Sequence, residues 1–284
     1  MLKERIAALQ KRYVTLEDGR YGHLVGHGDP SSIRGEGKKG SGGVLALHGF
    51  AGTPNEVRVV TEAAARCGLS SRAPRLPGHD SDVRHLLPMG WADWIAAAKD
   101  ALFELADTTG RRVVVAGLSL GSLLATDLAV HHGDRIAGLI VLANATRLRF
   151  PSPSLVLGLC DLVRPLRNAF YVPKEGADIQ DVDVRRDHLT YDVTPVQSAV
   201  EVLRAGRRVR RELGRVTCPT LVVHGALDRV CPVENAERFA RALGTRDVEV
   251  AVMPHSGHIV SADRDRAEVA RLIEQFLEKA AARM

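Results

Sequence analysis

The stretch Val113-Val-Val-Ala-Gly117-Leu-Ser119-Leu-Gly121 decides the fold class of this 284-residue chain. The pattern G-x-S-x-G stands here directly after an apolar, strand-like run and directly before a helical run. Such a sharp turn lifts the serine hydroxyl above the edge of a sheet, and the flanking glycines relieve crowding between strand and helix. The free N–H groups at the start of the helix can then face a developing oxyanion. In this context the pattern predicts that Ser119 is a nucleophile.

On both sides of this stretch, short apolar strands alternate with helices. This alternation is typical of a mostly parallel central sheet with helices on both faces, which defines the α/β class. Residues 28–43 are rich in Gly, Ser and Lys, and we expect them to form a loop. The expected strands are residues 44–47, 69–73, 113–116, 136–143, 220–224 and 248–253, and the expected helices are residues 55–67, 91–107, 121–131, 196–213, 233–243 and 267–280.

The alternation is interrupted once, by a segment rich in proline and charge. We interpret residues 144–195 as a small cap or lid inserted into a single domain rather than as a second domain. Residues 1–143 and 196–284 then form one core, with an N-terminal helix over residues 1–12. A chain of this length can bury a sizeable core without help from disulfides or metal.

The loop after the first core strand contains a His-Gly turn, Leu47-His48-Gly49-Phe50. Such a turn can aim the backbone N–H of Phe50 at an oxyanion, and Leu120 can supply a second N–H from the start of the helix after Ser119. We expect His48 to have a structural role.

A candidate acid and two candidate bases follow the last two core strands. Asp228 ends Leu221-Val-Val-His-Gly-Ala-Leu-Asp228, and His255 and His258 lie in Pro254-His-Ser-Gly-His258. An Asp in that loop can bind the imidazole of a base and fix its tautomer. The chain order Ser, Asp, His is that of the α/β-hydrolase fold.

With these pieces in place, the chain resembles the bacterial carboxylesterase and monoacylglycerol-lipase group of α/β-hydrolases. The resemblance runs from about Gly42 to Phe276 and is weakest through the cap. The matching motifs are Leu47-His-Gly-Phe-Ala-Gly-Thr-Pro54, Pro74-Arg-Leu-Pro-Gly-His79, Trp91-Ala-Asp-Trp94, Gly117-Leu-Ser-Leu-Gly121, Tyr191-Asp-Val-Thr-Pro195, and the loops of Asp228 and Ser256-Gly-His258.

The resemblance implies a serine carboxylic-ester hydrolase that acts on short- to medium-chain acyl esters, including monoacylglycerol-like molecules. It implies that His258 rather than His255 is the base, and that the N–H groups of Phe50 and Leu120 form the oxyanion hole. His79 would belong to a loop that shapes the site. The chain departs from the usual Gly-Leu-Ser-Met-Gly-Gly elbow by having Leu120 for Met and Ser122 for the second Gly, and both replacements are compatible with the turn.

An apolar helical face in the cap suggests where an acyl chain would bind. Leu155, Leu159, Leu162 and Val163 recur at helical spacing near the carboxyl ends of the strands. We interpret them as substrate-binding residues, and packing against the core is an equal alternative for this face.

Composition excludes several classes of protein. The net charge of +5 and the pI of about 9.2 come from scattered Arg residues, so we expect no nucleic-acid partner. The four cysteines form no CxxC or CxxH pair, which argues against a zinc site and for reduced thiols in the cytoplasm. We expect no cofactor and no metal.

Neither a signal peptide nor a membrane-spanning run is recognisable in the sequence, so we expect no stable membrane insertion. Peripheral contact through Leu2, Ile6 and Leu9 stays open, as does the choice between monomer and homodimer.

Several functions use the same three catalytic groups, a serine nucleophile, a histidine base and an aspartate, and therefore stay open. These are a thioesterase, an amidase or aminopeptidase, and an acyltransferase. For an aminopeptidase, Glu175, Asp178, Asp181 and Asp183 in the cap could hold a substrate amine. A non-catalytic ligand receptor on the same fold is the alternative from outside enzymology.

Overall fold

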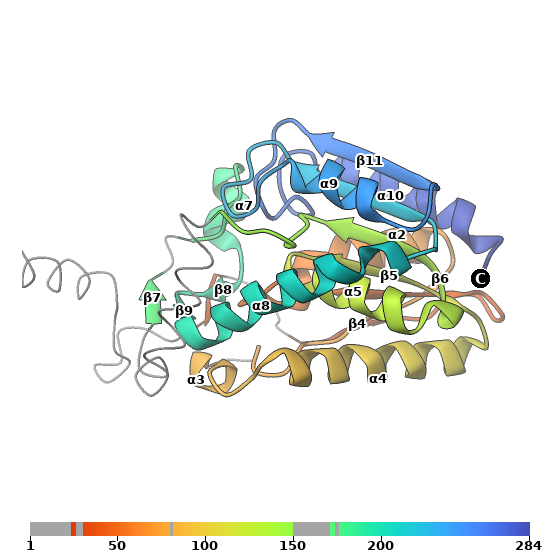
Figure 1. The fold of residues 1–284 in the computed structure, drawn as a ribbon, viewed down its shortest axis with the longest axis horizontal. Coiled ribbons are helices and arrows are strands. Elements are labelled where there is room, and N and C mark those ends of the chain that lie inside the picture. The colour runs from red at the N-terminus through yellow and green to blue at the C-terminus, as the bar shows by residue number, and fades with distance from the viewer. Residues whose placement is uncertain (1–23, 27–30, 80–81, 150–170, 174–175) are drawn as a thin grey trace, which may run out of the picture.

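A seven-stranded, mostly parallel sheet forms the centre of the protein (Figure 1). The computed structural model describes residues 24–26, 31–79, 82–149, 171–173 and 176–284. The strand order is β11-β10-β6-β5-β3-β4-β2, and every neighbouring pair is parallel except β2 and β4. The strands are β2 (Ile33–Gly35), β3 (Gly43–Leu47), β4 (Ser70–Ala73), β5 (Val113–Leu118), β6 (Ile136–Leu142), β10 (Thr220–Gly225) and β11 (Val248–Met253).

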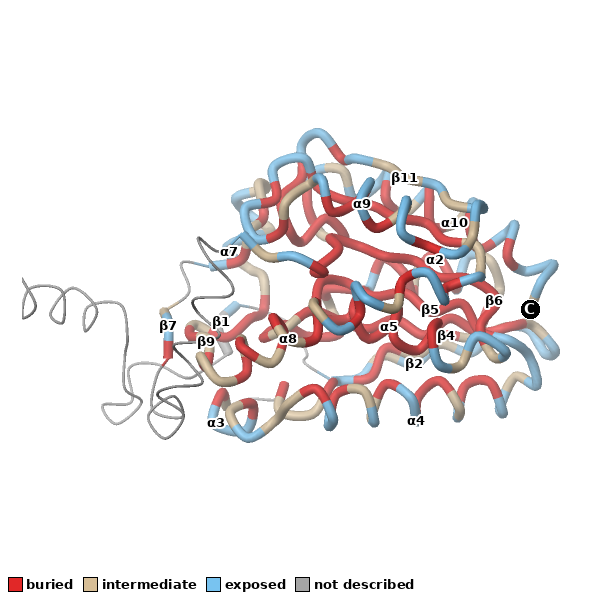
Figure 2. Tube along the Cα trace, viewed as in Figure 1, coloured by how far each residue is buried: buried red, intermediate tan, exposed pale blue. Residues whose placement is uncertain are grey.

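Helices cover both faces of the sheet because alternate strand residues point to opposite sides. In β3, Leu45 and Leu47 pack with the helices of one face, whereas Val44 and Ala46 pack with those of the other. Helices α4 (Trp91–Thr109), α5 (Leu120–His131), α8 (Val196–Glu212) and α9 (Asn235–Ala242) lie on the first face, and α2 (Arg58–Arg66) and α10 (Arg266–Ala281) lie on the second. Figure 2 shows the buried strands running between these layers.

The predicted parallel sheet and its α/β class are therefore confirmed, and the predicted elements agree with the observed ones to within a few residues. The first turn of the predicted helix over residues 55–67 is the separate 3₁₀ helix η1 (Pro54–Val57). The remaining 3₁₀ turns of the described residues are η2 (Gly133–Arg135) and η4 (Leu213–Arg215).

One prediction is wrong in part. The expected loop over residues 28–43 contains the edge strand β2, in which Ile33 pairs with Ala73 and Gly35 with Ser71. An antiparallel edge strand needs only main-chain hydrogen bonds to its neighbour, and its side chains stay partly exposed. A stretch with little apolar pattern can therefore be a strand, which composition alone does not reveal.

The first residues of the predicted cap, from Asn144 onward, are buried in the protein. Asn144 and Ala145 are buried, and Asn235 of α9 donates a 2.8 Å bond to the carbonyl of Asn144. The later parts are α7 (Val182–Asp187), β8 (Thr190–Tyr191), which pairs with β1 (Leu24–Val25), and β7 (Tyr171–Pro173), which pairs with β9 (Val193–Pro195). The short helix α3 (Val83–Leu86) precedes α4. The division into core and cap stays a prediction, and the expected helix over residues 1–12 lies outside the described residues.

The expectations about membrane spans and about the cysteines can be compared with the described residues. None of their helices has the length and hydropathy needed to cross a bilayer. Cys67, Cys218 and Cys231 are free thiols, and Cys160 lies outside the described residues.

Candidate active site

Ser119 occupies a strained turn between β5 and α5. Its backbone has φ 54° and ψ −112°, which places a residue with a Cβ in the left-handed region of φ. Such a conformation costs roughly 1–3 kcal/mol and persists only where the surroundings impose it. Here the Ser119 N–H donates 3.0 Å to the carbonyl of Leu142 in β6, and the Ser119 carbonyl accepts from Ser122 N–H at 2.9 Å. The turn is thus held from both sides.

The two flanking glycines are required by contact between backbones. A Cβ on Gly117 would lie 2.0 Å from the carbonyl oxygen of Gly121, and one on Gly121 would lie 1.9 Å from that of Leu47. Both distances are far below van der Waals contact with atoms that cannot rotate away. The predicted role of these glycines, close approach of strand and helix, is confirmed.

Three buried side chains form a continuous hydrogen-bonded relay. His258 Nε2 lies 2.9 Å from Ser119 Oγ, and His258 Nδ1 lies 2.9 Å from Asp228 Oδ2. Since a carboxylate only accepts, Nδ1 carries the proton of the neutral ring and Nε2 accepts from the serine hydroxyl. Ser119 is 8% exposed, His258 6% and Asp228 2%. The structure thus brings together the three residues that the sequence predicts as nucleophile, base and acid.

The carboxylate of Asp228 is held as an anion. Its Oδ1 accepts from the N–H groups of Val230 and Cys231, each at 2.7 Å. Its Oδ2 faces His258 and lies 3.0 Å from His224 Nε2. Burial would raise the pKa of Asp228, but the charge of His258 and the contacts with both histidines hold this pKa well below its usual range.

The pKa of the base His258 is shifted upward, whereas that of Asp228 is shifted downward. Burial would lower the pKa of its imidazole, but the charge of Asp228 raises this pKa well above the ordinary value of 6.5. Its loop is fixed by two further acids, because Gly257 N–H donates 2.7 Å to Asp263 and His258 N–H donates 3.2 Å to Asp178. His255, the other candidate, is exposed.

The loop after β3 lies against the nucleophile. A Cβ on Gly49 would be 3.5 Å from the Cβ of Ser119. The N–H groups on either side of Phe50 have acceptors, since Gly49 donates to Glu56 at 2.8 Å and Ala51 donates to His79 at 3.0 Å. Leu120 is the first residue of α5. The predicted oxyanion donors, the N–H groups of Phe50 and Leu120, thus belong to the two segments that flank Ser119.

His48 and His79 bind backbone, in agreement with the structural roles expected for them. His48 Nε2 accepts from Leu76 N–H at 3.0 Å, and its Nδ1 lies 2.9 Å from the carbonyl of Gly49. Burial lowers the pKa of His48 and lowers that of His79 to about 3. Both rings are therefore neutral at physiological pH and shape the loop without adding charge.

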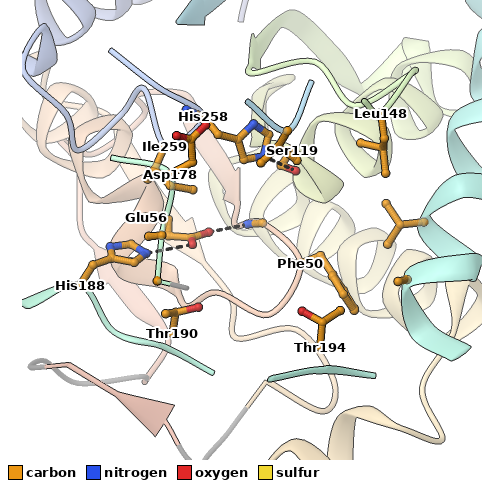
Figure 3. Close-up of a pocket in the computed structure, with 16 residues that line it drawn as sticks. Phe50, Glu56, Ser119, Leu148, Asp178, His188, Thr190, Thr194, His258 and Ile259 are labelled. Atoms are coloured by element: carbon orange, nitrogen blue, oxygen red, sulfur yellow. Dashed lines mark hydrogen bonds and ion pairs between the residues drawn. The ribbon is translucent and has the colours of Figure 1, made fainter. Parts of the chain in front are cut away.

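A pocket of about 280 Å³ opens beside Ser119 and His258 (Figure 3). One part of its wall is apolar, and another carries Glu56 and His188, which face each other in Figure 3. The predicted substrate-binding residues Leu155, Leu159, Leu162 and Val163 lie outside the described residues. The apolar lining observed is Phe50, Leu148, Ala177, Ala199, Val202, Val230 and Ile259.

Sequence reasoning missed several polar residues of this site, including His224, Glu56 and His188. His224 stands in the motif that ends at Asp228, and its spacing of four residues was the available signal. Glu56 and His188 are 132 residues apart, so no local pattern connects them.

Two sets of side chains in the described residues are close enough to share a metal ion. One consists of Asp228, Cys231 and His258, and so overlaps the relay. In the other, His131 turns Nδ1 to Asp127 at 3.4 Å and Nε2 to Glu212 at 3.9 Å, so a different nitrogen faces each acid. The expectation of a metal-free protein stays a prediction.

The parallel sheet, the strained serine turn and the order Ser, Asp, His define the α/β-hydrolase fold. Residues 38–265 match the model of the family described as serine aminopeptidase, S33. The chain therefore belongs to this serine aminopeptidase S33 family.

Two curated relatives and one solved structure that resemble the chain have lipolytic or esterolytic names. The chain is 30% identical to a thermostable monoacylglycerol lipase of Bacillus sp. (strain H-257) over 244 residues, which cover 85% of this chain and 91% of the relative. It is 24% identical to a carboxylesterase of Bacillus subtilis (strain 168), over 85% of this chain and 94% of the relative. A solved structure from work on the metagenome-derived lipolytic enzymes LipS and LipT superimposes with a TM-score of 0.79 at 27% identity, covering 88% of this chain and 98% of the other.

Proposed function

We propose that this chain is a serine ester hydrolase in which Ser119 is the nucleophile, His258 the general base and Asp228 the residue that orients the base. The observation that carries the proposal is the buried relay, with 2.9 Å from Ser119 Oγ to His258 Nε2 and 2.9 Å from His258 Nδ1 to Asp228 Oδ2. The named activities of the relatives, monoacylglycerol lipase and carboxylesterase, support the same reaction class.

The first half of the reaction forms an acyl-enzyme. His258 Nε2 takes the proton of Ser119 Oγ while this oxygen attacks the ester carbonyl carbon. The carbonyl oxygen becomes an oxyanion, which the N–H groups of Phe50 and Leu120 stabilise. When the C–O bond to the alcohol breaks, protonated His258 gives its proton to the departing alkoxide.

The second half releases the acid. His258 takes a proton from water as the water oxygen attacks the acyl carbon of the ester on Ser119. The second oxyanion forms in the same position, and its collapse breaks the bond to Ser119 Oγ. The serine oxygen recovers its proton from His258, so the enzyme returns to its starting state.

Short- to medium-chain acyl esters, including monoacylglycerols, are the proposed substrates. The pocket has an apolar wall for the acyl chain, including Leu148 and Val202. Its volume of about 280 Å³ is close to the lower end of typical ligand sites, which favours small substrates. We propose Leu155, Leu159, Leu162 and Val163 as further substrate-binding residues on the basis of the sequence.

The test is hydrolysis of a series of p-nitrophenyl esters from acetate to palmitate, and of a monoacylglycerol, by the wild type and Ser119→Ala. We expect an optimum at short to medium acyl length in the wild type and loss of that activity in the variant. Full activity in Ser119→Ala would show that another residue is the nucleophile. A wild type inactive on every ester would refute ester hydrolysis.

The aminopeptidase alternative needs free acids in the cap. Asp178 is occupied, because it accepts from Arg229 N–H at 2.7 Å and pairs with the Arg229 guanidinium at 2.9 Å. Asp181 caps α7, and Asp183 is exposed on that helix, while Glu175 lies outside the described residues. Because Asp178 and Asp181 are engaged in contacts within the protein, these two acids favour an ester over an aminoacyl substrate. A panel of aminoacyl p-nitroanilides, thioesters and alcohol acceptors compares the remaining acyl-transfer reactions directly.

We further propose a cytoplasmic protein, monomeric or homodimeric, without stable membrane insertion and without a nucleic-acid partner. Its three described thiols are free, which suits a reducing compartment. Binding to a polyanion through net charge weakens as the salt concentration rises. If elution from a heparin column does not depend on salt, the net charge of +5 has no role in binding polyanions.

A further inference from the structure

Glu56 is a buried carboxylate that no step of the proposed reaction uses. It lies in η1, and its side chain is 4% exposed. Its Oε1 is 3.2 Å from His188 Nε2, and the His188 side chain is 7% exposed. Both residues line the pocket that contains Ser119 (Figure 3). A buried charge is costly without a partner, so this pair stands out as a feature to explain.

The other oxygen of Glu56 holds the loop that carries Phe50. Gly49 N–H donates to Glu56 Oε2 at 2.8 Å. The carboxylate fills the space beneath the loop, since a Cβ on Gly52 would lie 2.1 Å from Oε1 and one on Gly49 would lie 2.9 Å from Oε2. The N–H of Gly49 directly precedes that of Phe50 in the chain. A shift of the carboxylate would therefore move the proposed oxyanion donor.

The segment after His188 holds the same loop at a second point. Thr190 Oγ1 donates to the carbonyl of Ala51 at 2.9 Å, and Tyr191 N–H donates to the same carbonyl at 3.4 Å. Ala51 itself has φ 58°, a left-handed conformation that a residue with a Cβ adopts only under constraint. Hydrogen bonds to η1 and to β8 thus both hold the loop in place.

The electrostatics of the pair agree with an anionic Glu56. Burial would raise the pKa of this carboxyl, but the hydrogen bond and charge of His188 lower it, and so does the hydrogen bond from the N–H of Gly49. The net pKa is below the ordinary value of 4.5. An ionised acceptor makes a stronger bond to a backbone N–H than a neutral one does.

We propose that Glu56 is a positioning residue of the oxyanion hole, which fixes the N–H of Phe50 through Gly49 and is itself held by His188 from the cap segment. The inference rests on the proposed function, because the oxyanion hole matters only if Ser119 attacks a carbonyl. Glu56 acts through the loop and does not touch the reacting atoms. Its effect is therefore on the transition state, where the oxyanion exists, and not on the bound ester.

The test compares Glu56→Leu with Glu56→Gln. The two side chains have similar volumes, but only Gln keeps an acceptor for Gly49 N–H. We expect Glu56→Leu to lower kcat about 10- to 100-fold, because displacement of a catalytic group by an ångström costs up to two orders of magnitude. KM should change less than about twofold, since the ground-state ester does not depend on the hole. Glu56→Gln should restore most of kcat.

A trifluoromethyl ketone of the same acyl length supplies a second measurement. It forms a hemiketal with the serine, so its affinity should fall in Glu56→Leu by about the same factor as kcat. Glu62→Leu is the matched control, because it makes the same substitution in an exposed ion pair between Glu62 of α2 and Arg266 of α10, and it should behave as the wild type. A role limited to stability would lower the melting temperature without moving the ratio of kcat to KM.

The outcomes separate this inference from the proposed function. An active wild type together with an unchanged kcat in Glu56→Leu would overturn the inference and leave the ester hydrolase intact. An inactive wild type would overturn both. If Glu56→Leu does not fold, Glu56→Asp withdraws the carboxylate by one methylene and should lower kcat with KM unchanged, and a wild-type kcat there would overturn the inference equally.

Discussion

Replacement of Asp228 by Asn tests how the relay sets the tautomer of the base. Asp228 Oδ1 receives two backbone N–H groups, from Val230 and Cys231, at 2.7 Å each. The amide oxygen of Asn must take that position, because an NH₂ group there would face two donors. The NH₂ group of Asn then faces His258 Nδ1.

The consequence is a base with its proton on the wrong nitrogen. Nδ1 of His258 must accept from the Asn amide, so the ring proton moves to Nε2, 2.9 Å from Ser119 Oγ. A protonated Nε2 cannot take the serine proton. We expect kcat to fall by about 10³- to 10⁴-fold, which corresponds to roughly 4–5.5 kcal/mol of transition-state stabilisation.

The pH profile should move at the same time, in a direction fixed by the pKa of His258. The imidazole is a base only when neutral, and the charge of Asp228 raises its pKa well above 6.5, so wild-type activity is lost as the pH falls through that raised value. Asn removes the charge and leaves the burial, which lowers the pKa. The acid limb of kcat/KM should therefore shift to lower pH in the variant.

The assay is p-nitrophenyl ester hydrolysis from pH 5 to 9, with thermal unfolding as a check on the fold. Asp127→Asn is the matched control, because Asp127 is a buried acid on α5 whose pKa is raised by burial and which lies outside the relay. It should retain wild-type kcat. A loss of less than about tenfold in Asp228→Asn, or an acid limb that stays in place, would refute the assigned role of Asp228.

Three further changes test separate parts of the structure. In Gly121→Ala the new Cβ would lie 1.9 Å from the carbonyl oxygen of Leu47, so the free energy of unfolding by denaturant should fall by about 3 kcal/mol or more, and a loss below about 1 kcal/mol would contradict the close contact. His255 is exposed, so His255→Ala should keep kcat/KM within about twofold of the wild type, whereas His258→Ala should abolish ester hydrolysis; the reverse result would exchange the two histidines. Val202 lines the pocket, so Val202→Trp should lower the ratio of octanoate to acetate hydrolysis by about tenfold, and an unchanged ratio would place the acyl chain elsewhere.

Much of the fold and the relay could be predicted from sequence because their causes are local. The turn at Ser119 needs an apolar strand before it, a helix after it and glycines at 117 and 121, and all of these are adjacent in the chain. Strands buried on both faces read as unbroken apolar runs, so the parallel sheet was predictable as well. The loops of Asp228 and His258 follow core strands whose carboxyl ends meet at one edge.

The resemblance to lipolytic enzymes supplied what local pattern did not. It identified His258 rather than His255 as the base, a choice that position in the chain could not make because both histidines follow the last core strand. The 2.9 Å contact between His258 and Ser119 agrees with that choice. The acyl-binding face remains a prediction because Leu155, Leu159, Leu162 and Val163 lie outside the described part of the chain, and the division into core and cap remains a prediction as well.

Sequence alone therefore determined the features that depend on residues adjacent in the chain or on their order. These are the apolar strands, the glycine-flanked serine turn and the order of the three relay residues. Only the tertiary structure decided which distant groups meet. Strand β2 depends on main-chain pairing with β4, and the contact of Glu56 with His188 joins residues 132 apart. Backbone pairing and buried ion pairs leave no periodic signal in the chain, since they are defined by distance in space and not by spacing in sequence.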